Sequence, residues 1–176
     1  MKPETKKRLL DYLLYLAIII SGIALDQLTK LLASVYLKSV PTHPIIEGVL
    51  HLTYTENRGA AFGMLADQRW IFMTVSTVAI IAMAAYLFIR RGPTPLYAVA
   101  LSMVISGGIG NMIDRIALGY VVDFIDFRLI NFAIFNGADS LVCVGAGLLI
   151  LALVLDIIKE YRSEKEKKTG AEDSEK

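Results

Sequence analysis

The sequence predicts an all-α membrane protein with four transmembrane helices, a small extracytoplasmic β-sheet, and an interfacial loop or short helix. Two observations carry this prediction. Hydrophobic residues make up 55% of the 176 residues, and the segments 70–89 and 92–113 contain no Asp, Glu, Lys or Arg. A helix rises 1.5 Å per residue, so about 20 apolar residues cross the hydrocarbon core of a bilayer. Each of these two segments is therefore long enough to be a span.

Four spans are expected at about residues 10–37, 70–89, 95–113 and 138–158. The first and the last reach full length only if they include an aspartate near one end, Asp26 and Asp139 respectively. The basic start followed by an apolar run also fits a cleaved signal peptide. The apolar pattern continues past Asp26, however, which favours a retained span. Residues 159–176 alternate Glu and Lys and are expected to form a solvated cytoplasmic tail.

The distribution of basic residues predicts the orientation. Lys and Arg gather at residues 2–8, at 90–91 and at 159–168. Such clusters favour the cytoplasmic side, so both termini are expected inside and the two long connections outside. The first connection, 38–69, contains an alternating segment at 48–55 that predicts a strand, followed by a tight turn and a second short strand. The second connection, 114–138, is expected to carry a short helix or turn around 121–124.

The informative polar residues all map to the outer end of the predicted bundle. Ionisable groups at membrane depth cost free energy, so their convergence at one level indicates a functional site. Asp26 and Lys30 are four residues apart and can pair on one helix face. The full set is Asp26, Lys30, Asn57, Asn111, Asp114, Arg115, Asp123, Asn136 and Asp139.

The residue types at this end favour carboxylate chemistry. No Ser or Cys stands in a nucleophile setting with His: Cys143 lies between valines and is expected to be buried, and His43 and His51 are isolated loop residues. There is no metal-ligand set, no phosphate loop and no basic stripe for nucleic acid. Two neighbouring carboxyls hold one proton between them and can activate a water molecule toward an amide. This is the chemistry of an aspartyl peptidase.

The partner of Asp139 is either Asp114 or Asp123. Asp114 stands beside Arg115, whose charge favours a permanently ionised, structural carboxylate, whereas desolvation between Val122 and Phe124 can raise the pKa of Asp123. Asp123 is therefore preferred. Asp126 is the weakest choice, because its neighbour Arg128 and the surrounding loop suggest solvent.

Two other classes of function compete with a peptidase. A proton-conducting or transport relay could use Asp26, Lys30, Asp114 and Asp139, but it needs polar groups through the whole membrane depth. The segments 12–23 and 75–89 are nearly all apolar. A scaffold that recruits a partner through its outer loops would leave the intramembrane carboxylates without a role.

Five motifs in order resemble those of bacterial lipoprotein signal peptidase, also called signal peptidase II, of aspartyl peptidase family A8. They are Asp-Gln-Leu-Thr-Lys at 26–30, Asn-Arg-Gly-Ala-Ala-Phe at 57–62, Gly-Asn-Met-Ile-Asp-Arg at 110–115, Val-Val-Asp-Phe at 121–124 and Phe-Asn-Gly-Ala-Asp-Ser at 135–140. The resemblance extends over about residues 13–158.

The resemblance implies an intramembrane endopeptidase with Asp123 and Asp139 as its catalytic dyad. The implied reaction removes the signal peptide of a diacylglyceryl-modified prolipoprotein, cleaving before the lipidated cysteine, without metal or cofactor. The implied location is the bacterial inner membrane, with the active site near the extracytoplasmic face, in contact with membrane lipid; sensitivity to globomycin is also implied. The implied supporting or substrate-binding residues are Asp26, Lys30, Asn57, Gly59, Ala60, Asn111, Asp114, Arg115, Asn136 and Ala138.

Overall fold

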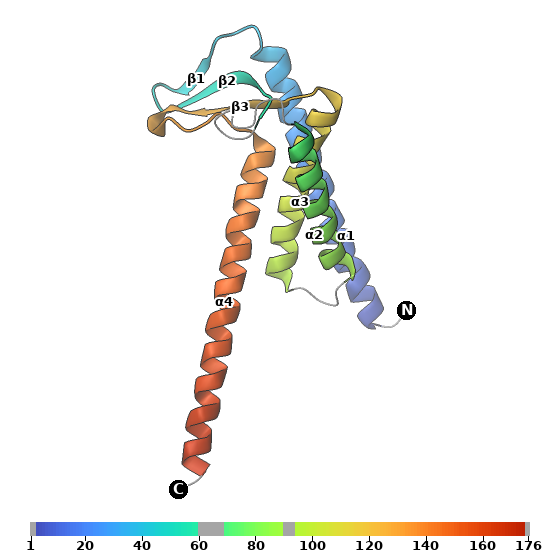
Figure 1. Ribbon diagram of the computed structural model, residues 1–176, viewed down its shortest axis with the longest axis vertical. Coiled ribbons are helices and arrows are strands. Elements are labelled where there is room, and N and C mark those ends of the chain that lie inside the picture. The colour runs from blue at the N-terminus through green and yellow to red at the C-terminus, as the bar shows by residue number, and fades with distance from the viewer. Residues whose placement is uncertain (1–2, 60–68, 90–93, 175–176) are drawn as a thin grey trace.

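The computed structural model describes residues 3–59, 69–89 and 94–174. These contain four α-helices, α1 (Pro3–Tyr36), α2 (Arg69–Ile89), α3 (Pro95–Ala117) and α4 (Gly137–Ser174). Strands β1 (His43–Ile46), β2 (Leu50–Asn57) and β3 (Val121–Phe127) form one antiparallel sheet in that order, and a short 3-10 helix, η2, follows at Arg128–Ile130. The sheet lies across one end of the helices, and both chain termini lie at the other end (Figure 1).

The helices have the surface of a membrane protein. Within the described residues, three segments are long and apolar enough to cross a bilayer, Glu4–Tyr36, Pro95–Ala117 and Gly137–Lys165, and α2 adds a shorter apolar segment, Met73–Ile89. Large apolar side chains stand exposed on the outside of the helices, including Ile20, Val75 and Ile150. A contiguous apolar exterior of this kind is expected where lipid is the solvent.

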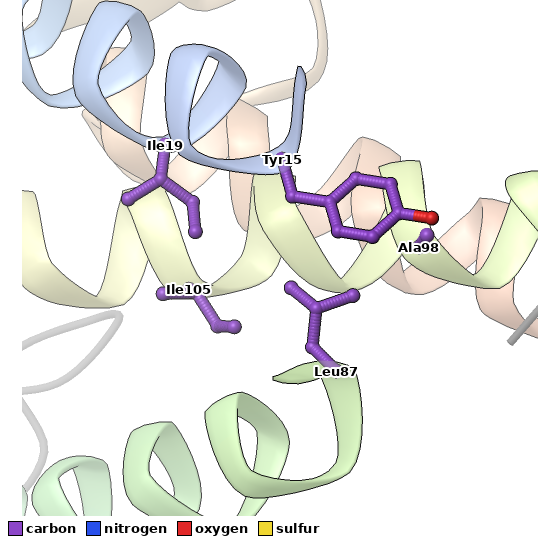
Figure 2. Packing of buried hydrophobic residues seen from close by; sticks show 5 residues of the cluster. All are labelled: Tyr15, Ile19, Leu87, Ala98 and Ile105. Atoms are coloured by element: carbon purple, nitrogen blue, oxygen red, sulfur yellow. The ribbon is translucent and has the colours of Figure 1, made fainter. Parts of the chain in front are cut away.

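The half of the bundle far from the sheet is held by an apolar core. Tyr15 and Ile19 of α1, Leu87 of α2, and Ala98 and Ile105 of α3 meet there, as Figure 2 shows. None of these five side chains is charged. The relay of acidic residues considered as an alternative function therefore has no continuation through this layer.

Small residues let α3 and α4 approach closely. A side chain at Gly107 would collide with the backbone oxygen of Ala138, and one at Gly145 would lie 2.8 Å from the oxygen of Ala100. On the opposite side of α3, the hydroxyl of Ser106 donates to the oxygen of Ile19 at 3.1 Å. Close backbone contact of this kind is how membrane helices associate where no hydrophobic driving force acts between them.

The second connection differs from the sequence prediction. The strand expected at 48–55 is present as β2, but the segment 121–124, expected as a short helix or turn, is part of strand β3. It pairs with β2, with Thr55 opposite Asp123, and its first three residues are buried. The second short strand expected after Asn57 falls on residues that lie largely outside the described ranges. Helix α4 also continues to Ser174, beyond the expected end of the span at 158.

The glycine at 145 gives a direct test of the α3–α4 contact. In Gly145→Leu the new side chain must push α3 away, since a Cβ there would also lie 2.7 Å from a methyl of Val104. We expect the melting temperature in detergent to fall by roughly 3 to 10 °C. Gly147→Leu is the matched control, because nothing lies within 4 Å of a Cβ at that position. Equal melting temperatures for the two variants would contradict the packing.

Candidate active site

A buried ion cluster lies where α1 and α3 reach the sheet. The ammonium of Lys30 is 2.9 Å from Asp26 Oδ2 and 3.1 Å from Asp114 Oδ2. Gln27 completes the group by donating to Asp114 Oδ1 at 2.9 Å and to the Gly110 oxygen at 3.2 Å. Asp26, Gln27, Lys30 and Asp114 are called the Lys30 cluster below. Asp26, Lys30 and Asp114 are each at most 3% exposed, so the charges compensate one another away from water.

The Lys30 cluster fixes the two segments that carry the acidic pair. Asp26 Oδ1 accepts the backbone N–H of Ala138 at 2.8 Å, which holds the start of α4. Asp114 Oδ2 accepts the backbone N–H of Val122 at 3.0 Å, which holds the start of β3. Gly110 makes room for this arrangement, because a Cβ there would lie 2.5 Å from Asp26 Oδ2.

The chain turns back on itself between Asp123 and Asp139. After β3 and η2, residue Phe135 pairs with Ile125 in an isolated bridge, with N–H to oxygen distances of 2.8 and 3.1 Å. The returning segment therefore places Asn136 beside the strand that carries Asp123. Two carboxylates sixteen positions apart in the sequence are thereby brought to one site.

Asn136 joins the two carboxylates. Its side-chain oxygen accepts the N–H of Asp139 at 2.9 Å, while Asp139 Oδ2 accepts the N–H of Asn136 at 3.2 Å. This reciprocal pattern is a capping box at the start of α4, and it confirms that Asn136 caps the helix. The Asn136 side-chain NH₂ group also donates to Asp123 Oδ1 at 2.6 Å.

Every oxygen of the two carboxylates accepts an N–H. Besides the bonds from Asn136, Asp123 Oδ2 accepts from the side-chain NH₂ of Asn57 at 2.9 Å, and Asp139 Oδ1 accepts from that of Asn111 at 2.7 Å. These donors hold both carboxylates in fixed orientations, each with room for a further partner on the cavity side.

Both carboxylates line one cavity, of about 530 Å³. Asp114 does not line it, so the structure brings Asp123, and not Asp114, to the same wall as Asp139. Arg115 reaches the cavity as well, donating to the oxygens of Asn111 and Gly59 at 3.4 Å. The residues around the cavity are Asn57, Gly59, Asn111, Arg115, Val121, Asp123, Phe132 to Phe135, Asp139, Ser140, Cys143 and Val144.

The environment of Asp123 favours proton exchange. The pKa of the Asp123 carboxyl is raised to about 6, mainly because burial removes the hydration of a carboxylate, and the negative charge of Asp139 acts in the same direction. The hydrogen bonds from Asn57 and Asn136 and the charge of Lys30 act in the opposite direction. A carboxyl with this pKa can take up or release a proton near neutral pH.

Most of the site residues expected from sequence lie in the Lys30 cluster or around the cavity. One expected residue lies outside the described ranges, and one residue of the site was not expected. Ala60 lies outside the described residues. Gln27 was missed, although a polar residue beside Asp26 in an otherwise apolar helix was a usable signal. Among the described residues, no group of three or more His, Cys, Asp and Glu could hold a metal ion.

Two further expectations were wrong. Cys143 is exposed on α4 and borders the cavity, because α4 turns this face away from α3. Asp126 is buried in the sheet at 8% exposure, because Thr53 and Arg128 donate to its Oδ2 at 2.7 and 2.9 Å.

Comparison with known proteins gives one consistent family. The family model described as signal peptidase (SPase) II matches residues 18–155. A lipoprotein signal peptidase of Caldanaerobacter subterraneus subsp. tengcongensis is 50% identical over 125 residues, covering 71% of this chain and 85% of that protein. One of Brevibacillus brevis is 44% identical over 145 residues, covering 82% and 95%.

A solved structure agrees with these relatives. The chain is similar to a bacterial membrane enzyme solved by the in meso method at 2.3 Å resolution, with a TM-score of 0.76 and 34% identity over 81% of this chain and 88% of that one. The protein is therefore a peptidase that belongs to the signal peptidase II family.

Proposed function

We propose that this protein is an aspartyl endopeptidase of the membrane that removes the signal peptide from diacylglyceryl-modified prolipoproteins, with Asp123 and Asp139 as its catalytic dyad. The observation that carries the proposal is the pair of carboxylates on one cavity wall, joined through Asn136. Membership of the signal peptidase II family supports the choice of substrate.

In the proposed reaction the dyad holds one proton. The ionised carboxyl takes a proton from a water molecule as the water oxygen attacks the carbonyl carbon before the lipidated cysteine. The protonated carboxyl donates to the carbonyl oxygen as its charge develops. The resulting tetrahedral intermediate collapses when the carboxyl that took the proton of the water delivers it to the leaving nitrogen and the other carboxyl takes its proton back from a hydroxyl of the intermediate. The peptide bond breaks, a free amine is left on the cysteine, and the dyad again holds one proton. The pKa of Asp123, at about 6, supports this exchange near neutral pH.

The lining of the cavity suits the two parts of such a substrate. The dyad, Asn57 and Arg115 are its polar members, beside which the peptide bond would lie. Phe132 and Val144, which are 51% and 53% exposed, are apolar members of the lining at the surface of the protein. In a bilayer these exposed apolar side chains would contact lipid, so acyl chains on the substrate cysteine could stay among the membrane lipids during cleavage.

The membrane placement completes the proposal. All four helices cross the bacterial inner membrane, with α2 as the shortest span. Both termini lie in the cytoplasm, in keeping with the basic residues at 2–8 and 159–168. The sheet and the dyad then lie near the extracytoplasmic face, which supports access to precursors that have already been translocated and lipidated.

Removal of either acidic group tests the dyad. We expect Asp123→Asn and Asp139→Asn each to lower the rate of precursor cleavage by at least about 10³-fold, because an amide cannot accept the proton of the attacking water. Cleavage of a diacylated precursor by the purified variants in detergent is the measurement. Asp156→Asn is the control, since it makes the same change in exposed α4 about 25 Å further along the helix. Turnover by either dyad variant at the rate of the control would contradict the assignment of Asp123 and Asp139 as the catalytic dyad.

A pair of substrates tests the specificity for lipid. The wild-type protein is incubated with a diacylated precursor and with its unlipidated twin of identical sequence. We expect only the first to be cut, because the acyl chains hold the scissile bond at the level of the cavity. Equal cleavage of both would contradict the proposed substrate class while leaving the peptidase chemistry in place.

A further inference from the structure

The third contact of the Lys30 ammonium leads toward the dyad. Besides Asp26 and Asp114, Lys30 Nζ lies 2.9 Å from Asn111 Oδ1. An ammonium has three N–H groups and no acceptor, so these three partners occupy it fully. Two of them are carboxylates and form ion pairs with it. The third is a neutral amide that belongs to the cavity wall.

This contact decides which way the Asn111 amide faces. Its oxygen must point to Lys30, since an NH₂ group there would meet an ammonium, donor against donor. Its NH₂ group must then point the other way, where it donates to Asp139 Oδ1 at 2.7 Å. In the flipped orientation both contacts would be lost, and an amide oxygen would face a carboxylate oxygen.

Asn136 gives a weaker hold on the same amide. Its NH₂ group donates to Asn111 Oδ1 at 3.1 Å, but the same group also serves Asp123 Oδ1 at 2.6 Å and the Val122 oxygen at 3.3 Å. The two N–H groups of the Asn136 amide would still have two acceptors, Asp123 Oδ1 and the Val122 oxygen, if they did not donate to Asn111. Lys30, at 3% exposure and without other neutral partners in the described contacts, has no such freedom.

The orientation matters because the dyad changes its protonation during the proposed reaction. When Asp139 is ionised, it attracts the Asn111 NH₂ group by itself. When Asp139 is protonated, its O–H could instead donate to an amide oxygen, and the amide could flip. An ammonium has no acceptor, so Asn111 presents its oxygen to Lys30 and its NH₂ group to Asp139 at either stage.

We propose that Lys30 is a positioning residue of the peptidase, which locks the Asn111 amide so that Asp139 Oδ1 receives an N–H throughout the reaction. This inference rests on the proposed function of the dyad. It follows that the shared proton is kept away from Asp139 Oδ1.

The test is a double-mutant cycle. The first change is Lys30→Met with Asp114→Asn, which removes one positive and one negative charge and so keeps the net charge of the Lys30 cluster. The second change is Asn111→Ala. We expect the first change to lower kcat for a diacylated precursor roughly tenfold with KM within about twofold, and to cost little more once Asn111 is absent.

Two results would overturn the inference. One is that the first change lowers kcat by the same factor with and without Asn111→Ala. That result would mean that Lys30 acts through long-range electrostatics or through general stability, and not through Asn111. An unchanged kcat after the first change would mean that the lock is not needed. If the Met variant does not fold, Lys30→Gln with Asp114→Asn replaces it, because a terminal amide can present either its oxygen or its NH₂ group to Asn111.

The outcome is distinguishable from failure of the proposed function. An inactive wild-type protein, or an active Asp123→Asn variant, would reject the peptidase dyad itself. A cycle with independent effects, in an enzyme that depends on Asp123, would reject only the role of Lys30. Melting temperatures of all variants, measured in the same detergent, separate loss of fold from loss of rate.

Discussion

The site depends on one buried lysine that is compensated by two aspartates. Removing Lys30 alone would leave two carboxylates without their cation in the protein interior, at a cost of about 3 to 5 kcal/mol. The charged groups of the Lys30 cluster lie close together, but their hydrogen bonds hold two segments that are distant in the sequence. Asp26 holds the first turn of α4 and Asp114 holds the first residues of β3, so the two segments that carry the acidic pair are anchored to the same cation.

The carboxylates of the dyad have different hydrogen-bond partners from those of the Lys30 cluster. The hydrogen bonds described for the dyad carboxylates come from side-chain amides and a backbone N–H, while Arg115 and Lys30 add electrostatic attraction. Neutral donors orient a carboxylate with less cost to its protonated form than a salt bridge, so the pKa of Asp123 can stay high. The structural aspartates, Asp26 and Asp114, are thus distinguished from the aspartates of the dyad by their hydrogen-bond and ion-pair partners.

Much of this arrangement could be predicted from sequence, but the strand at Asp123 could not. The helices follow the apolar segments, and the acidic residues stand at their ends, so convergence was expected. Residues 121–127 do not alternate apolar with polar side chains, and their partner strand β2 is more than sixty residues away, so neither the pattern nor the pairing leaves a local mark. Cys143 was misplaced for a related reason: a membrane helix is apolar all round, so its pattern does not say which face meets protein.

The most direct measurement of the central claim, that Asp123 and Asp139 share one site, is the titration of their carboxyls by infrared difference spectroscopy. The wild-type protein should show a carboxyl that titrates at a pH of about 6 and is absent in Asp123→Asn. In Asp139→Asn that titration should move to lower pH, because the neighbouring negative charge is gone. An Asp123 titration that stays in place without Asp139 would show that the two groups do not interact, and would contradict the account.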